Sequence, residues 1–216
     1  MNEISTVLPP EGAAVDEDAP WQPLHPEQLA DLLSDVDAPW YVAAGWALDL
    51  HRGEQTRPHH DLEIGVPRAA FPRIAAALPQ YAFHAVEQGR VLPPTEAALA
   101  ETFQTWAWDP DGSVYRVDVF RERHDGDVWV CRRDERVRLP YADIVRHTAA
   151  GLPYLAPELA LLFKAKACRP KDQADFTGVL PLLTAAERAR LRDLLDLVHP
   201  GHEWLAALTA AGRTAG

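Results

Sequence analysis

Apolar and polar positions follow two different patterns along this chain, and the change falls near residue 155. Before it, short apolar runs bounded by turn residues predict strands at 40–44, 62–66, 81–86, 103–108, 114–120 and 128–131. Helical spacing in the same part predicts helices at 26–36, 46–51 and 68–78, and 91–100, with two prolines, is predicted to be a loop. After residue 155 the spacing is helical, at 157–167, 171–183, 185–198 and 202–211.

This order of elements predicts an α+β fold, in which a mixed or antiparallel sheet with flanking helices is followed by a helical C-terminal part. Residues 1–22 are rich in Pro, Asp and Glu with few large apolar side chains, which predicts a flexible arm. We therefore divide the chain into an arm at 1–22, an α/β core at 23–155 and a helical part at 156–216.

Segment lengths and cysteine content exclude several classes of protein. No apolar run approaches the roughly 20 residues that a membrane-spanning helix needs. The N-terminus lacks the basic and apolar stretches of a secretory signal. The two cysteines, Cys131 and Cys168, cannot build a disulfide framework or a CxxC metal site. We therefore expect a cytoplasmic protein that has no membrane partner.

The charge is unevenly distributed. The chain has 21 basic and 32 acidic residues, a net charge of −11, which argues against DNA as a partner. Residues 1–51 contain ten acids and neither Lys nor Arg, so the rest of the chain is nearly neutral. This acidic stretch is either a solvated surface or a negative field that attracts a cationic substrate.

Three acids stand on predicted strands or directly beside one. Asp61 and Glu63 flank Leu62, so their carboxylates project from one face, roughly 6–7 Å apart at ~3.3 Å per residue. Like charges this close favour a bound cation, and Mg²⁺ prefers such oxygen ligands. Asp118 lies between Val117 and Val119 on a later strand. It is either a third ligand or an acid on the solvent face of an edge strand.

Small residues and lysines suggest where an anion could bind. Ala44 and Gly45 lie between a strand and a helix, where backbone N–H groups can approach phosphate, although a tight turn needs the same residues. The chain's three lysines, Lys164, Lys166 and Lys171, lie within eight residues of one another, as an anion site or as solvated helix charges.

A pair of histidines and a pair of tryptophans are the remaining candidate site residues. His59 and His60 are adjacent on an extended segment and point to opposite faces, which disfavours a zinc site. Trp106 and Trp108 share a face of a predicted strand and either belong to the core or line an acceptor pocket.

Together these pieces resemble a known family. The resemblance is carried by WYVAAGWALDLHRGEQTRPHHDLEIGV (40–66), YRVDVF (115–120) and YLAPELALLFKAKACRPKDQADF (154–176). These segments are similar to the polymerase-β-type nucleotidyltransferase superfamily, and within it to aminoglycoside and lincosamide nucleotidyltransferase-like proteins. The resemblance covers about residues 25–185. It departs at Ala44, where the family has the first glycine of a pair, which implies a different loop or weaker nucleotide binding.

The resemblance implies a nucleotidyltransferase sheet and an adenylyltransferase-like enzyme that moves a nucleoside monophosphate from an NTP, with ATP expected, to a hydroxyl. It also implies two Mg²⁺ ions. Asp61 and Glu63 would bind the metal of the nucleotide, and Asp118 would bind the second metal and act on the acceptor hydroxyl as a base. The implied nucleotide-binding residues are Ala44, Gly45, Trp46, Arg57, His60 and Lys164.

The acceptor remains open at this point. A small hydroxylated molecule fits the family, and the acidic N-terminal stretch favours a cationic one, as in aminoglycoside-like antibiotics. The first alternative is a catalytically silent protein or a toxin–antitoxin component with the same fold. The second is an enzyme acting on tRNA or protein, which the net charge disfavours for tRNA and the arginines of residues 116–146 keep open.

Overall fold

The computed structural model describes residues 20–87, 90–92 and 95–211, and it divides the chain into two compact units. The first unit comprises Met1–Trp40 and His59–Glu122, and the second comprises Tyr41–Pro58 and Arg123–Gly216. Both units therefore draw on two separate stretches of sequence. The predicted boundaries at 22 and 155 remain predictions, and the predicted arm up to residue 19 lies outside the described residues.

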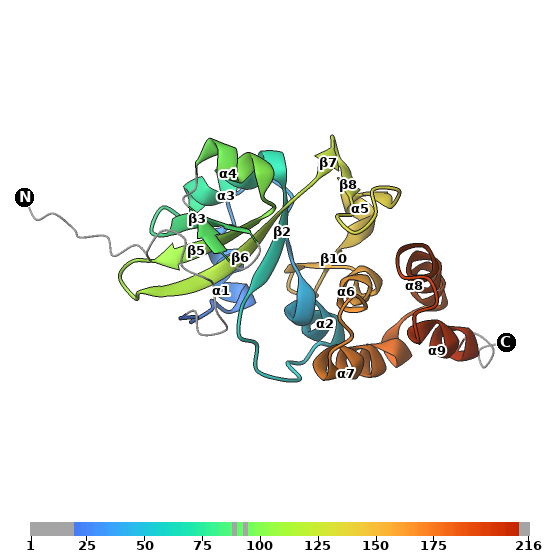
Figure 1. Cartoon of the computed structure of the whole chain (residues 1–216). Coiled ribbons are helices and arrows are strands. Elements are labelled where there is room, and N and C mark those ends of the chain that lie inside the picture. Colours follow the sequence, from blue (N-terminus) through green and yellow to red (C-terminus); the bar gives the residue numbers. More distant parts are fainter. Residues whose placement is uncertain (1–19, 88–89, 93–94, 212–216) are drawn as a thin grey trace, which may run out of the picture. The chain divides into compact units, whose positions relative to one another are not determined.

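A mixed sheet forms the centre of the first unit (Figure 1). Its strands lie in the order β2 (Glu63–Pro67), β6 (Val114–Glu122), β5 (Gln104–Asp109), β3 (Ala82–Glu87) and β4 (Arg90–Leu92). β2 and β6 are parallel, and the other neighbouring pairs are antiparallel. The unit also contains α1 (Pro26–Leu32), a 3₁₀ turn at Arg68–Ala70, α3 (Phe71–Ala77) and α4 (Glu96–Glu101).

Most of strand β6 is buried on both faces, so both its apolar and its polar side chains are shielded from solvent. Val117 and Val119 are fully buried, and Asp118 between them is only 3% exposed. The register between β5 and β6 shifts beside Trp108, which pairs Tyr115 with Trp108 and brings those two rings to 4.9 Å. An aromatic core of Trp106, Trp108 and Tyr115 results, which confirms the core prediction for both tryptophans.

The segment entering the first unit lies beside the start of β6. Trp21 forms a parallel bridge with Tyr115, and the amide of Leu24 donates to the carbonyl of Arg116 at 3.1 Å. The Trp21 ring packs edge-on against Trp106, with ring centres 4.9 Å apart. Residue 21, placed in the arm by the sequence, therefore contributes to the aromatic core.

The second unit combines short strands with a run of helices. β1 (Tyr41–Val42) pairs parallel with β11 (Pro153–Leu155), which pairs antiparallel with β10 (Val145–His147). β7 (His124–Asp125), β8 (Val128–Val130) and β9 (Arg138–Pro140) form a separate antiparallel sheet. The helices are α2 (Ala44–Arg52), α5 (Tyr141–Ile144), α6 (Pro157–Lys164), α7 (Pro170–Val179), the 3₁₀ turn Leu180–Leu182, α8 (Ala185–Val198) and α9 (Trp204–Ala211).

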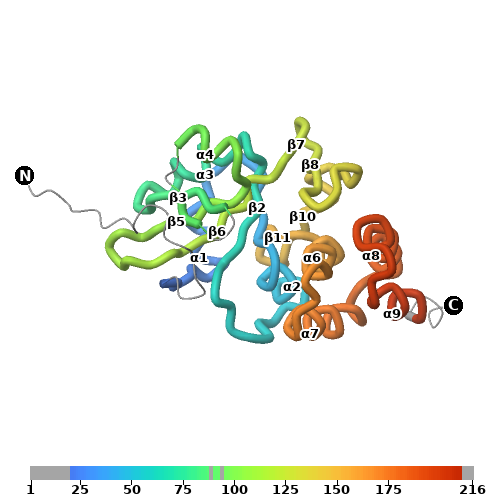
Figure 2. The backbone as a smooth tube through the Cα atoms, in the orientation of Figure 1, coloured from blue at the N-terminus to red at the C-terminus, as the bar shows by residue number. Residues whose placement is uncertain are grey.

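The helical C-terminal part is evident from α6 onward, and Figure 2 traces it from orange to red. Helix α2 packs against both α6 and α7, although more than 100 residues separate them in sequence. None of the helices in the described residues is long and apolar enough to cross a membrane.

The predicted fold class is confirmed: a mixed sheet with flanking helices precedes a helical part. The prediction of a loop at 91–100 is wrong, because β4 includes residues 91 and 92 and α4 includes residues 96–100. Thr95 caps that helix by accepting a hydrogen bond from the amide of Ala98, a common N-terminal stabilisation. The helix predicted to reach Val36 ends at Leu32 and continues as turns.

Candidate active site

Two neighbouring strands place an acidic pair on one face of the first unit's sheet. Glu63 on β2 and Asp118 on β6 are register partners in the parallel ladder. The amide of Asp118 donates to the carbonyl of Leu62 at 2.8 Å, which fixes that register. Register partners project to the same side of a sheet, so the two carboxylates share a face. The predicted pairing of an Asp-Leu-Glu acid with an acid on another strand therefore has a structural basis.

Asp61 precedes β2 by two residues. Leu62 is fully buried, while Asp61 and Glu63 are half-buried, as expected if the two acids project opposite to Leu62. Within the part of the chain that the structure describes, no three His, Cys, Asp or Glu side chains stand as a ready metal site. The role of the three acids as metal ligands is thus a proposal.

Residues of β5 border Asp118 on the other side. The side-chain amide nitrogen of Gln104 lies 2.6 Å from an oxygen of Asp118, and Trp106 is the register partner of Asp118. Sequence reasoning missed Gln104, because a lone glutamine at the start of a strand carries no chemical signature. Only the strand register reveals that it faces the acid.

The start of α2 has an unusual backbone. The helix begins at Ala44, two residues before the predicted start, and Ala43 accepts its first hydrogen bond from the amide of Ala47. Ala44 has φ +49°, in the left-handed region that glycine tolerates better than alanine. Gly45 and Trp46 follow as buried residues of the first turn.

The loop between α2 and the Asp61 segment is tied down by Asp49, which is 4% exposed. Its main-chain carbonyl accepts from the amides of Gly53 and Glu54, and its carboxylate accepts from the hydroxyl of Thr56 at 2.7 Å. These hydrogen bonds hold the conformation of the loop, and Arg57 follows directly after Thr56 at its end.

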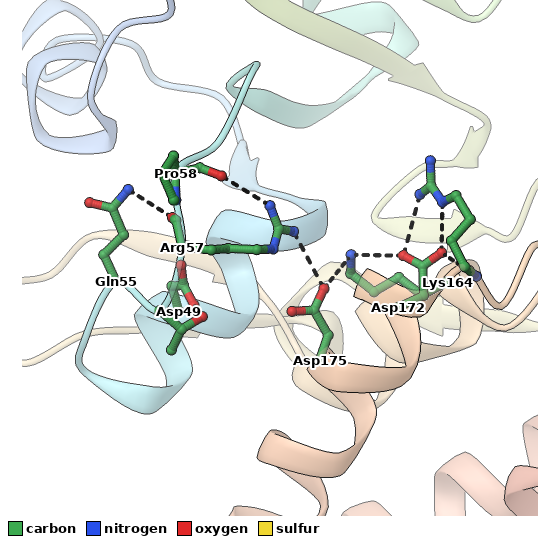
Figure 3. A network of polar contacts seen from close by, with 9 residues as sticks. Asp49, Gln55, Arg57, Pro58, Lys164, Asp172 and Asp175 are labelled. Atoms are coloured by element: carbon green, nitrogen blue, oxygen red, sulfur yellow. Dashed lines mark hydrogen bonds and ion pairs between the residues drawn. The ribbon is translucent and has the colours of Figure 1, made fainter.

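Arg57 begins a chain of ion pairs that Figure 3 shows in close-up. Its guanidinium lies 3.4 Å from an oxygen of Asp175 on α7. The same oxygen is 2.8 Å from the ammonium of Lys164 on α6, which also lies 3.3 Å from Asp172. Arg169 closes the chain, since its side chain and amide both donate to Asp172.

Burial determines how these charges behave. Lys164 is 8% exposed and Asp172 is fully buried, whereas Lys166 and Lys171 are exposed. Burial alone would raise the pKa of Asp172, but hydrogen bonds from Arg169 and the charge of Lys164 outweigh it and hold that pKa below its ordinary value. The interpretation as solvated helix charges therefore holds for Lys166 and Lys171 and is wrong for Lys164.

His60 lies in the segment that precedes Asp61 and is exposed. Its ring centre is 6.2 Å from that of Trp21. The structure thus places His60 beside an aromatic side chain.

Comparison with known proteins gives one family match and several similar solved structures. Residues 27–104 match the family of aminoglycoside-2''-adenylyltransferases. No curated protein matches the chain. The solved structure of the lincosamide antibiotic adenylyltransferase LnuA, with lincomycin bound, has a TM-score of 0.52 and 15% identity, covering 73% of this chain and 95% of that one.

A second solved structure, ANT(2")-Ia in complex with adenylyl-2"-tobramycin, has a TM-score of 0.45 and 14% identity, covering 88% of this chain and 95% of that one. The family match includes the Asp61 and Glu63 segment and ends before Asp118. The motif resemblance is therefore supported over residues 27–104, and the fold is shared with the lincosamide antibiotic adenylyltransferase.

Proposed function

We propose that this enzyme transfers a nucleoside monophosphate, with ATP as the expected donor, to a hydroxyl of a small antibiotic-like acceptor in a Mg²⁺-dependent reaction. One observation carries the proposal: Glu63, within the family-matching segment, is the register partner of Asp118 on the adjacent strand. Two carboxylates on one face, with Asp61 two residues away, would supply oxygen ligands of the kind that this chemistry uses.

The donor set fits divalent cations of the Mg²⁺ class. Carboxylates held close together repel one another unless a cation is bound, and Mg²⁺ usually takes one or two carboxylates plus the phosphates of its substrate. Asp61 and Glu63 would hold the ion of the nucleotide, and Asp118 a second one. When bound, such ions neutralise charge on the attacking and leaving oxygens of an in-line displacement.

The remaining proposed roles belong to this chain's own groups. Asp118 would orient the acceptor hydroxyl and accept its proton, since a carboxylate is the available base on that face. The backbone N–H groups of Gly45 and Trp46, at the start of α2 after Ala44, would favour phosphate oxygens. Arg57 and His60, which lie in the segment just before Asp61, would contact the nucleotide. Lys164 would act indirectly, through the ion pairs with Asp175 that also hold Arg57.

The comparisons and the charge support the proposed acceptor class. The matched family acts on an aminoglycoside, and the lincosamide enzyme shares the fold, so a hydroxylated small molecule is the first choice. The ten acids of residues 1–51 favour a cationic one. A silent or toxin–antitoxin role, and transfer to tRNA or protein, are distinguished by the experiment below.

The test is label transfer from each of the four NTPs, labelled at the α-phosphate, to aminoglycosides, lincosamides, tRNA and the protein itself. Transfer to an antibiotic is expected from the wild type and should be lost in Asp61→Asn. Asp196→Asn, which changes an exposed acid of α8, serves as the matched control and should retain activity. Transfer to tRNA alone, or to none of the acceptors, would refute the proposal.

A binding measurement separates a silent fold from an enzyme offered the wrong acceptor. NTP with Mg²⁺ should raise the melting temperature, because a ligand at 100 times its Kd stabilises the native state by about 2.7 kcal/mol. NTP with EDTA should raise it much less. Equal shifts under both conditions would indicate a nucleotide site that does not use the carboxylates.

A further inference from the structure

We propose that Gln104 is a positioning residue for Asp118, holding the carboxylate of this candidate base with its side-chain amide. The inference rests on the proposed function and adds a residue that neither the motifs nor the comparisons assign. Its basis is the 2.6 Å contact between Nε2 of Gln104 and Oδ2 of Asp118.

The strand register makes this contact a built feature of the sheet. Gln104 begins β5, and its register partner on β6 is Phe120, two residues beyond Asp118. Gln104 and Asp118 are therefore diagonal neighbours on one face, a separation that a long side chain can bridge. Gln104 is half-buried and Asp118 is 3% exposed, so the bond forms largely away from water.

The chemistry of the two groups dictates the direction of the bond. An ionised carboxylate only accepts hydrogen bonds, so Gln104 must turn its NH₂ group toward Asp118. An amide orients the carboxylate without cancelling its charge. An arginine or lysine at this position would neutralise the negative charge that a divalent cation needs.

Neighbouring groups explain why Asp118 needs orienting. Glu63, its register partner on β2, presents a like charge on the same face. Trp106, its register partner on β5, fills the adjacent space with an apolar ring. A donor from Gln104 offsets the repulsion from Glu63 and selects one orientation of the carboxylate before metal and nucleotide arrive.

The experiment compares Gln104→Leu and Gln104→Asn with Gln80→Leu, a control that makes the same change at an exposed glutamine of the same unit. Two properties are measured: steady-state transfer, and Mn²⁺ binding followed by electron paramagnetic resonance with a non-hydrolysable NTP analogue. Melting temperatures establish that each variant is folded.

We expect Gln104→Leu to lower kcat by roughly 10- to 100-fold, the usual effect of losing a group that orients a ligating side chain. The KM for NTP should change less than about threefold, because the donor acts on Asp118 and makes no contact with the nucleotide. Gln104→Asn, one methylene shorter, should behave like Gln104→Leu, and Gln80→Leu like the wild type.

The decisive comparison uses Asp118→Asn. If Gln104 acts only through Asp118, the double variant Gln104→Leu/Asp118→Asn binds Mn²⁺ no more weakly than Asp118→Asn alone. A folded Gln104→Leu with wild-type kcat and Mn²⁺ affinity, or losses that add in the double variant, would overturn the inference. Failure of the wild type to transfer label would instead refute the proposed function, and the Mn²⁺ comparison would still decide the role of Gln104.

Discussion

Replacing Lys164 with methionine should destabilise the protein far more than the same change at another lysine. Methionine keeps the unbranched length of the side chain but removes the ammonium that contacts Asp172 at 3.3 Å and Asp175 at 2.8 Å. Both carboxylates are then left buried with one cation fewer. Removing one partner of a buried ion pair typically costs about 3–5 kcal/mol.

The structure indicates the lower end of that range. Asp172 keeps its hydrogen bonds from Arg169, and Asp175 keeps Arg57 at 3.4 Å. We therefore expect a loss of about 3 kcal/mol in the free energy of unfolding. For a chain of this length that corresponds to a melting temperature lower by about 6–12 °C.

The assay is urea unfolding of Lys164→Met, with Lys166→Met as the matched control. Lys166 is exposed, so its substitution should change stability by less than about 0.5 kcal/mol. Adding Asp175→Asn to Lys164→Met removes one uncompensated charge and should recover part of the loss, giving a coupling of about 1 kcal/mol or more. Equal stability of the two lysine variants, or no coupling with Asp175, would refute a buried network.

Three further predictions follow from single features. Ala44→Gly should stabilise the protein by up to about 1 kcal/mol in urea unfolding, because the alanine backbone is strained at a φ of +49°. A destabilised variant would contradict this prediction. Burial lowers the pKa of His84, so its contribution to the free energy of unfolding is full above about pH 6.5 and is lost as the pH falls through the folded-state pKa. His84→Gln should therefore flatten the decrease in the free energy of unfolding between pH 7 and pH 5, and an unchanged slope would count against this prediction. Neutralising the exposed Asp31, Asp35 and Asp37 together should raise KM for a cationic acceptor at low salt and leave kcat nearly unchanged; an unchanged KM would reduce them to a solubilising surface.

Elements whose own sequence fixes their geometry were predictable. α8 spans Ala185–Val198 as expected, because its apolar spacing is regular and Thr184 and Glu187 form a capping box at its start. The strands around Ile64 and Val119 were recognisable from buried β-branched residues. Short elements such as β9 to β11 were missed, because two or three residues carry too little pattern and depend on partners distant in sequence.

Some features of the candidate site could likewise be predicted from the sequence, and others could not. The Asp61–Glu63 pair was predictable, because alternation along a strand sets the direction of each side chain within three residues. The contact between Gln104 and Asp118 was not, because it depends on how β5 registers against β6. The environment of Lys164 was also out of reach, since its burial results from the packing of α6 against α7 and α2.

The partners of the acids, more than their spacing, distinguish structural from chemical roles. Asp172 and Asp175 are spaced along a helix and receive fixed cations from Lys164 and arginine side chains. Their charge is already balanced in the folded chain, so they have little attraction left for a metal ion. The contact that β5 gives Asp118 is a neutral amide, which orients the carboxylate and leaves its charge intact. Asp118 also has a second acid, Glu63, as its register partner on the neighbouring strand, and the proposed function therefore assigns the chemistry to this pair on β2 and β6.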